Sequence, residues 1–269
     1  MTDQTWIPVD VDTGRPSIAR IYDFHLGGSH NLPVDRAAAR EVVAMMPELP
    51  AILRANRAFL IRCVEYLAGR GVRSFLDLGS GIPTEGNVHE IAQAVNPQAQ
   101  VVYVDNDPVA VEHSRRILLG NDLAVAVDGD LRDAVSILTD PEVDRLMLGP
   151  GEPVAVLMSA VLHFVPDDAE AADLVAAYRD AIPSGSYLTV SHASLHEESA
   201  ARIGRAAEKY SRQVAPMKVR SREQVADLLK GFEILAPGVV YCEQWRPGPD
   251  DDPAPVYPLP QACAVARKP

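Results

Sequence analysis

The sequence predicts an α/β protein in which a doubly wound, mostly parallel sheet of seven strands follows an N-terminal helical cap. Three observations support this fold class. Residues 15–70 show helical spacing, apolar segments alternate with helical patterns after residue 70, and each connection between those segments can hold a helix. Such connections favour parallel strands with helices on both faces of the sheet. We expect an arm and helical cap over residues 1–70 and the sheet domain over residues 71–269.

The elements are expected in the following order. The N-terminal helices break at Gly27–Gly28 and around Pro47 and Pro50. The strands are expected at residues 74–78, 100–105, 123–128, 153–159 and 186–193. The helices between them are expected at residues 87–95, 108–119, 134–140 and 168–181. Helices at 197–213 and 222–230 then precede late strands at 232–235, 239–244 and 262–267. The last two strands, joined by the proline-rich loop 246–260, predict an antiparallel edge.

The composition is that of a globular protein with an acidic balance. Hydrophobic residues make up 47% of the 269 residues and charged residues 23%, and 25 basic against 37 acidic residues give a net charge of −12. This balance argues against nucleic acid as the main partner, because phosphate neutralisation needs clustered Lys and Arg. The N-terminus lacks the features of a signal peptide, and no apolar run is long enough for a membrane span. We therefore expect a cytoplasmic protein without a membrane partner.

A glycine turn after the first expected strand is the most informative segment. The apolar residues 75–78 run into Gly79 and Gly81, and a helical pattern follows. Glycine tolerates positive φ and leaves no Cβ between the backbone and a ligand, while amides at the start of a helix can meet a polar group. Taken alone, the segment also fits a tight turn that binds nothing.

Carboxylates at the next two strand ends strengthen the binding interpretation. Asp105 ends the second strand, where it could accept the ribose hydroxyls of a nucleoside, and Asp130 follows the third, where it could reach the amino group of adenine. A dinucleotide-binding turn would carry Gly or Ala at the position of Thr84, and Asp77 would repel a pyrophosphate. A carboxylate at position 77 suits a cationic ligand, so the electrostatics favour S-adenosylmethionine over NAD.

These motifs resemble those of class I S-adenosylmethionine-dependent methyltransferases. The residues concerned are the DLGSG segment at 77–81, Asp105 and Gly129–Asp130. More narrowly, the segments 17–28, 54–60, 75–84 and 159–164 resemble an uncharacterised actinobacterial group of such enzymes. The resemblance covers about residues 16–268. It implies a Rossmann-like methyltransferase fold, S-adenosyl-L-methionine as cofactor, and methyl transfer to a small-molecule acceptor. The chain departs from the group at His25, where a Tyr is usual, and at Ser29–His30, where a pair such as Lys-Asp is usual.

The candidate site residues follow from the motifs and the resemblance together. The candidate cofactor-binding residues are Arg20, Asn56, Arg57, Asp77, Gly79, Ser80, Gly81, Asp105, Asn106, Asp130, Leu131 and Ser159. Arg57 could hold the methionine carboxylate or be a solvated helix residue. His192, His196 and Glu197 are metal-binding residue types, but their spacing does not provide a third suitable ligand. No metal site is therefore expected. The three cysteines, which lie far apart in the sequence, are expected to be free thiols.

The candidate catalytic residues are Tyr22, His25 and His163. His163 follows the fourth strand, where it could orient or deprotonate an acceptor or could be a structural histidine. The polar, glycine-broken segment 15–31 is expected to cover the cofactor and complete the acceptor pocket. Two other functions stay open at this point, a non-catalytic module that binds S-adenosylmethionine or S-adenosylhomocysteine, and a nucleotide-dependent oxidoreductase.

Overall fold

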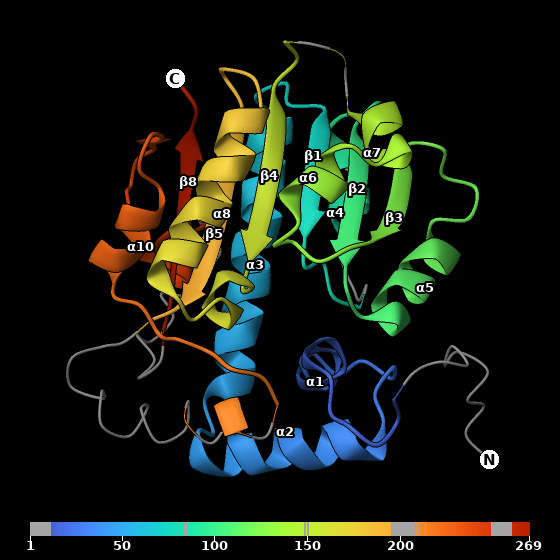
Figure 1. Cartoon of the computed structure of the whole chain (residues 1–269), viewed down its shortest axis with the longest axis vertical. Helices are drawn as coiled ribbons and strands as arrows, with labels where there is room; N and C mark the ends of the chain where they lie inside the picture. The colour runs from blue at the N-terminus through green and yellow to red at the C-terminus, as the bar shows by residue number, and fades with distance from the viewer. Residues whose placement is uncertain are drawn as a thin grey trace.

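Three N-terminal helices precede the sheet. The computed structural model describes residues 12–82, 86–147, 149, 151–194, 208, 210–212, 214–248 and 260–269. The helices are α1 (Ile18–His25), α2 (Pro33–Met45) and α3 (Leu49–Ala68), as shown in Figure 1. The helical pattern breaks near the expected glycines and prolines, although Pro50 lies in the first turn of α3, where its missing N–H costs no hydrogen bond.

The sheet confirms the doubly wound fold with an antiparallel edge. Its strands in the described residues are β1 (Ser74–Leu78), β2 (Gln100–Asp105), β3 (Ala124–Asp128), β4 (Val154–Ser159), β5 (Tyr187–Ala193), β6 (Glu233–Ile234), β7 (Val240–Tyr241) and β8 (Gln261–Arg267). The spatial order is β3-β2-β1-β4-β5-β8-β6, and β7 also pairs with β8. Strands β1 to β5 pair in parallel, whereas β8 runs antiparallel to β5.

The strand count is eight rather than the expected seven. The two short strands expected at 232–235 and 239–244 both join the sheet, as β6 and β7, and each pairs with a different part of β8. Between them lie Pro237, which has no N–H to donate, and Gly238, which adopts a φ of +97°. The break in the ladder therefore follows from two residues that cannot both continue an extended strand.

The remaining helices cover both faces of the sheet. They are α4 (Val88–Val95), α5 (Pro108–Ile117), α6 (Ala134–Leu138), α7 (Pro141–Leu146), α8 (Asp168–Ala181) and α10 (Arg222–Leu228). The expected helix over 134–140 ends early, and α7 begins separately, because Asp140 accepts hydrogen bonds from the amides of Glu142 and Val143 and so caps a new helix. Most of the expected helix over 197–213 lies outside the described residues.

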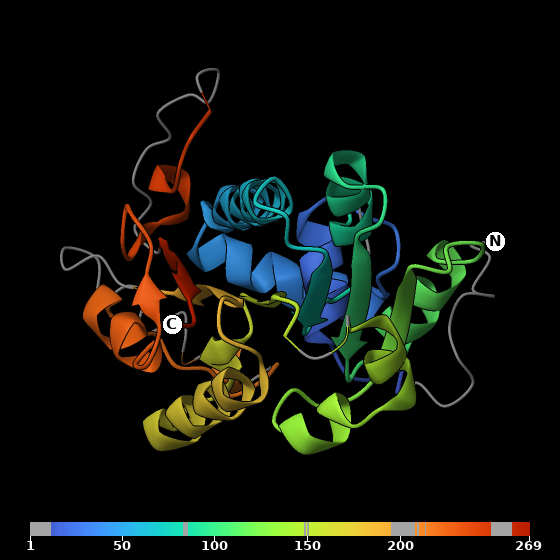
Figure 2. The same ribbon diagram turned by 90° about the horizontal axis from the view of Figure 1, so that it is seen from above.

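Alternation along the strands builds two apolar cores. Leu76, Val102 and Val156 point to the face packed by α6, α7, α8 and α10, whereas Phe75 and Val101 point to the face packed by α3 and α4. Figure 2 shows these two helical layers on either side of the sheet. Helix α3 shares its core with the sheet; the division of the chain at residue 70 stays a prediction.

The topology places the carboxyl ends of the parallel strands next to the first helices. The strand order reverses between β1 and β4, so a crevice is expected outside the carboxyl ends of these two strands. In Figure 1 the arrowheads of β1 to β5 point toward α1 and α2. The N-terminal helices therefore lie where an open α/β sheet binds its ligands.

Candidate functional site

A cavity of about 830 Å³ lies at the carboxyl ends of β1 to β4, with α1 on its far side. All twelve residues that the sequence predicts for cofactor binding line this cavity. They are Arg20, Asn56, Arg57, Asp77, Gly79, Ser80, Gly81, Asp105, Asn106, Asp130, Leu131 and Ser159. Residues from α1, from α3 and from four strand ends are thus brought together at one place, although their roles stay predictions.

The glycine turn after β1 needs glycine for two different reasons. Gly79 and Gly81 adopt φ values of +67° and +68°, a conformation that strains any other residue type except Asn and Asp. A Cβ at Gly79 would lie 2.4 Å from Cγ1 of Val161, whereas a Cβ at Gly81 would meet nothing within 4 Å. Gly79 is therefore required by close packing, and Gly81 keeps the cavity wall open.

Asp105 fixes the glycine turn and still has room for a ligand. Its Oδ2 accepts a hydrogen bond of 2.7 Å from the amide of Gly81, and its Oδ1 accepts one of 2.8 Å from the amide of Asp107. Each carboxylate oxygen has a second lone pair, so two acceptor positions remain. Burial raises the pKa of Asp105 to about 6, although the amides of Asp107 and Gly81 lower it.

Asp77 is a second buried carboxyl group on the cavity wall. Its side chain is only 4% exposed, and burial raises its pKa to about 7, with Asp105 adding to the rise and Arg57 opposing it. The Arg57 guanidinium donates a hydrogen bond of 2.8 Å to the backbone oxygen of Gly86. The cavity therefore offers two carboxyl groups whose charge is not fully compensated by the protein, which favours a ligand with a positive group.

Asp130 and Leu131, which follow β3, add a carboxylate and an apolar side chain to the cavity lining. Asp130 is exposed, and its side chain accepts a hydrogen bond of 2.9 Å from the amide of Arg132. The backbone oxygen of Leu131 accepts one of 2.9 Å from the hydroxyl of Tyr178, which fixes the segment in place. An apolar side chain beside an exposed carboxylate suits a flat base that carries an amino group.

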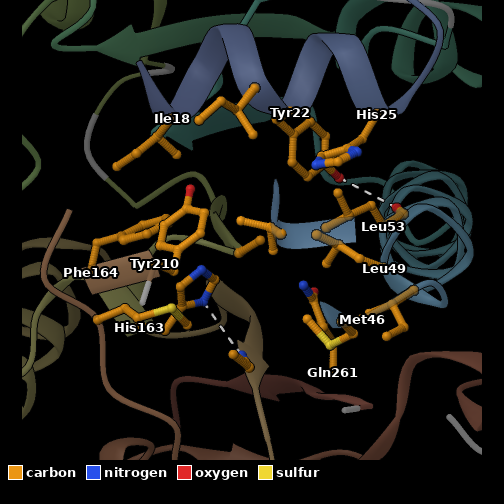
Figure 3. A pocket seen from close by; sticks show the side chains of 16 residues that line it. Ile18, Tyr22, His25, Met46, Leu49, Leu53, His163, Phe164, Tyr210 and Gln261 are labelled. Atoms are coloured by element: carbon orange, nitrogen blue, oxygen red, sulfur yellow. Dashed lines mark hydrogen bonds between the residues drawn. The ribbon is translucent and has the colours of Figure 1, made fainter. Parts of the chain in front are cut away.

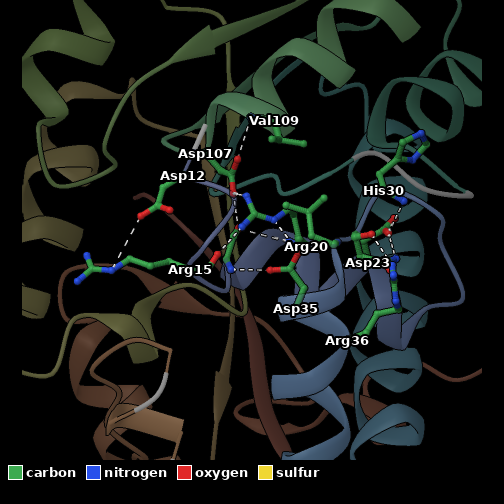
Figure 4. A network of polar contacts seen from close by, with 12 residues as sticks. Asp12, Arg15, Arg20, Asp23, His30, Asp35, Arg36, Asp107 and Val109 are labelled. Carbon is green, nitrogen blue, oxygen red and sulfur yellow. Dashed lines mark hydrogen bonds and ion pairs between the residues drawn. The ribbon is translucent and has the colours of Figure 1, made fainter. Parts of the chain in front are cut away.

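Arg20 belongs to a buried polar network that anchors α1. Its Nε donates to Asp35 at 2.7 Å, and its Nη2 donates to the backbone oxygen of Arg15 at 2.7 Å. Both side chains of the Arg20–Asp35 pair are buried. Figure 4 shows that Asp107 faces the same guanidinium, and the hydroxyl of Ser17 also donates to Asp107. Arg20 therefore lies at the cavity wall with much of its hydrogen-bonding capacity committed to the protein.

The glycine break after α1 is a packed turn. The backbone amide of His30 and the side-chain amide of Asn31 donate to Oδ2 of Asp23 at 2.9 and 2.8 Å. A Cβ at Gly28 would lie 1.9 Å from Oδ1 of Asp23, so no larger residue fits there without a shift. This turn holds the segment after α1 against the end of the helix.

Tyr22 and Asn56 link α1 to the ends of β4 and β5. The side-chain amide of Asn56 donates to the hydroxyl of Tyr22 at 3.0 Å, and its Oδ1 accepts a hydrogen bond of 2.5 Å from the hydroxyl of Ser191. Ser159 lies within 3.4 Å of the same oxygen. Burial raises the pKa of Tyr22, so its hydroxyl is protonated at neutral pH. Tyr22 can therefore position a ligand but is poorly suited to remove a proton.

A second, apolar pocket of about 100 Å³ adjoins the cavity, and Figure 3 shows its lining. All three residues that the sequence predicts for catalysis, Tyr22, His25 and His163, line it. The two spaces share Ile18, Tyr22, Ala160 and Phe164. Ala160 adopts a φ of +56°, and its amide donates to Oγ of Ser191 at 2.9 Å. A strained residue thus lies at the junction of the two spaces.

The two histidines at the ends of β4 and β5 differ in their availability. His192 is fully buried, with Nδ1 2.8 Å from the backbone oxygen of Ala193 and Nε2 2.9 Å from the guanidinium of Arg220. His163 accepts a hydrogen bond from the amide of Ala193 at Nδ1, and burial holds its pKa well below the usual value. His192 is therefore structural, whereas the Nε2 side of His163 stays available to the pocket.

Sequence reasoning missed two polar residues of this pocket, Tyr210 and Gln261. Gln261 begins β8, and because β8 runs antiparallel, this residue lies opposite Ala193 at the carboxyl end of β5. A polar residue at the start of an apolar strand was the available signal.

In the described residues, no group of three or more His, Cys, Asp and Glu side chains could hold a metal ion. Nor is any helix of this part of the chain long and apolar enough to cross a membrane.

Comparison with known proteins shows similarity to one family and to solved structures. The S-adenosyl methyltransferase family model matches residues 4–269. A candidate methyltransferase from Thermobifida fusca is 37% identical with a TM-score of 0.91, covering 98% of this chain and 99% of that protein. A DUF574 family protein from Streptomyces avermitilis is 38% identical with a TM-score of 0.90, covering 96% and 99%.

More distant matches show the fold alone. An O-methyltransferase family protein from Burkholderia thailandensis is 14% identical with a TM-score of 0.52, and the match covers 84% of this chain and 61% of that one. A comparison with curated proteins found no significant match. The family match and the two actinobacterial relatives nevertheless span nearly the whole sequence and confirm the predicted resemblance. This chain belongs to the S-adenosyl methyltransferase family.

Proposed function

We propose that this protein binds S-adenosylmethionine in the 830 Å³ cavity and transfers its methyl group to a small-molecule acceptor held in the adjoining pocket. One observation carries the proposal. Two buried carboxyl groups, Asp77 and Asp105, flank an open glycine turn, and an apolar pocket opens beside them. A cation-bearing nucleoside fits this cavity, whereas the pyrophosphate of a dinucleotide would face two carboxylates.

The residues present fit the cofactor at each of its parts. The Gly79–Gly81 turn would admit the methionine portion, and Asp77 would face its ammonium group directly or through water. Asp105, with its two remaining acceptor positions, would hold the ribose hydroxyls. Asp130 and Leu131 would frame the adenine. Arg57, which lines the cavity near Asp77, would face the methionine carboxylate.

The contribution of the protein is mainly position and exclusion of water. When bound, S-adenosylmethionine would supply a methyl group on a positively charged sulfur, which keeps the electron pair of the broken bond. The lone pair of the acceptor atom would form the new bond, and an acceptor atom that carries a hydrogen would then release that proton to water. Tyr22, held by Asn56, lies between the two spaces and can align an acceptor. The apolar walls of the pocket keep water away from the reacting atoms.

Isothermal titration calorimetry tests the cofactor assignment. We expect S-adenosylhomocysteine to bind with micromolar affinity, about −8 kcal/mol, and NADH to give no heat. Asp105→Asn should weaken this binding by about tenfold or more, because a hydrogen bond to a charged group contributes about 1.5–3 kcal/mol. Asp128→Asn is the matched control, since Asp128 ends the neighbouring strand β3 without lining the cavity.

Methyl transfer requires a separate measurement. The protein, incubated with methyl-labelled S-adenosylmethionine and a small-molecule extract of host cells, should transfer label into a low-molecular-weight product. Absence of S-adenosylhomocysteine binding, or equal binding of NADH, would contradict the cofactor assignment. Cofactor binding without label transfer into any fraction would favour a non-catalytic binding module instead.

A further inference from the structure

The apolar pocket has a composition that restricts what it can hold. Its walls come from α1, α2, α3, the loop after β4 and the first residue of β8. Among the described residues that line it, none is Asp, Glu, Lys or Arg. A carboxylate or ammonium group entering this space would lose its hydration without meeting an opposite charge, which is strongly unfavourable. The pocket therefore selects against charged occupants.

Two side chains in the pocket carry polar atoms without a hydrogen-bonding partner. These are Nε2 of His25 and Oε1 of Gln261, on side chains that are only 7% and 5% exposed. Buried polar atoms are nearly always paired, so two unpaired atoms that line one pocket need an explanation. Figure 3 shows the amide of Gln261 directed toward the interior of the pocket, with His25 on the opposite wall beside Tyr22.

The tautomer of His163 supplies a third polar group. Because Nδ1 accepts a hydrogen bond from the amide of Ala193, the neutral ring carries its proton on Nε2. The ring is neutral because burial disfavours its charged form. In Figure 3 the nitrogen that does not bond Ala193 faces the pocket near Tyr210. His163 therefore presents an N–H donor to the occupant of the pocket. It can hold the occupant by a hydrogen bond but does not remove a proton from it.

The volume limits the size of the occupant. A cavity of about 150 Å³ is enough to enclose benzene, and this pocket has about 100 Å³ of its own. The pocket shares Ile18, Tyr22, Ala160 and Phe164 with the larger cavity, so an occupant larger than the pocket would extend past these residues, which form the opening in this proposal. An occupant of about one ring can thus fill the pocket while one end reaches the opening.

We propose that this pocket binds an uncharged acceptor of about one ring, held by hydrogen bonds to His163 and Gln261, with its methylated atom at the opening beside Tyr22. The inference rests on the proposed function, because it treats the larger cavity as the cofactor site. It adds a substrate class, since acidic and cationic metabolites are excluded and uncharged compounds of about one ring are favoured.

Three matched probes test the charge restriction. They share one phenol ring and differ only at the para position, which carries a methyl group in p-cresol, a carboxylate in 4-hydroxybenzoate and a protonated aminomethyl group in 4-hydroxybenzylamine. Saturation-transfer NMR and calorimetry at neutral pH measure the affinity of each probe, with and without S-adenosylhomocysteine. We expect p-cresol to bind at least tenfold more tightly than either charged probe in both states, since the pocket is already formed.

Two variants locate the binding. Met217→Trp fills the pocket from a half-buried position and should reduce p-cresol affinity at least tenfold. Gln261→Leu should reduce it about two- to tenfold, the loss expected for one neutral hydrogen bond. Gln98→Leu, at an exposed position, is the control and should bind p-cresol as the wild type does. Both pocket variants should keep the wild-type affinity for S-adenosylhomocysteine if they are folded, which circular dichroism checks.

The outcomes separate the two proposals. Loss of S-adenosylhomocysteine binding in the wild type overturns the proposed function, while p-cresol binding still reports on the pocket. Equal affinities for the three probes, or p-cresol binding that neither Met217→Trp nor Gln261→Leu weakens, overturn the pocket assignment even when S-adenosylhomocysteine binds normally.

Discussion

Alanine should destabilise the protein at both glycines of the turn after β1, but by different amounts and for different reasons. Both glycines have positive φ, so either alanine costs about 1–2 kcal/mol of backbone strain. At Gly79 the new methyl would also lie 2.4 Å from Cγ1 of Val161, and such overpacking adds about 1–3 kcal/mol. At Gly81 the methyl meets nothing within 4 Å, so only the strain remains.

The expected values follow directly. Gly81→Ala should lower the free energy of unfolding by about 1–2 kcal/mol and Gly79→Ala by about 2–5 kcal/mol. Because Gly81 lines the cavity, its alanine variant should nevertheless lose at least tenfold in affinity for S-adenosylhomocysteine. Val161→Ala removes the clashing methyl, so the double variant with Gly79→Ala should recover about 1–3 kcal/mol relative to additivity.

Urea denaturation gives the stabilities, and calorimetry gives the affinities of the folded variants. The double-mutant cycle is the decisive comparison, because it isolates the contact between position 79 and Val161 from the backbone strain. If Gly79→Ala is no less stable than Gly81→Ala, or if Val161→Ala gives no recovery, the close approach does not explain why glycine stands at position 79.

Three further predictions concern the carboxyl groups and the cover. Burial raises the pKa of Asp77 in the folded protein to about 7, above its value in the unfolded chain. Between about pH 4 and 7 the folded protein therefore holds a proton that the unfolded chain has lost. The free energy of unfolding should fall as the pH rises through this range. Asp77→Asn should remove this loss and be more stable than wild type at pH 8 by up to about 4 kcal/mol, with no advantage at pH 4, as urea denaturation at both pH values will show. Asp35→Ala should cost about 3–5 kcal/mol, because it removes the buried partner of Arg20 and the acceptor for the amides of Ser17 and Leu32, whereas Asp35→Asn keeps an acceptor oxygen and should cost less. Hydrogen exchange should slow in residues 15–31 when S-adenosylhomocysteine binds, and unchanged exchange there beside a protected Gly79–Gly81 turn would contradict the cover.

The central strands were predictable because their burial is evident from the apolar residues of each segment alone. Strands β1, β2 and β4 are buried on both faces, so they appear as short apolar runs, and the helices between them leave little freedom in the connections. The details that were wrong depend on single residues. The Asp140–Pro141 pair divides α6 from α7, and residues 242–244, expected at the end of a strand, form a 3₁₀ helix after β7.

The residues of the cavity and of the adjoining pocket also differ in how far the local sequence could predict them. Asp77 and Asp105 lie at the ends of consecutive parallel strands, and any doubly wound topology brings such ends together. Gln261 reaches the pocket only because β8 runs antiparallel to β5, and Tyr210 only because its segment folds back against Phe164. These placements are tertiary. The position of Gln261 at the start of an apolar strand is a weak local signal, and no local pattern distinguishes Tyr210 from an ordinary polar residue.

One carboxylate connects the cavity, the glycine turn and α1, the helix that is predicted to be part of the cover. Asp105 accepts the amides of Gly81 and Asp107, and Asp107 in turn accepts the hydroxyl of Ser17 at the start of α1. Removing the Asp105 side chain altogether would therefore loosen the turn and the anchor of α1 as well as remove the proposed ribose contact. Asparagine keeps one acceptor oxygen of similar shape, so Asp105→Asn measures the charge while preserving most of the connection. A larger loss of affinity in Asp105→Ala than in Asp105→Asn would then measure how much of the binding depends on the turn and the cover being held in place.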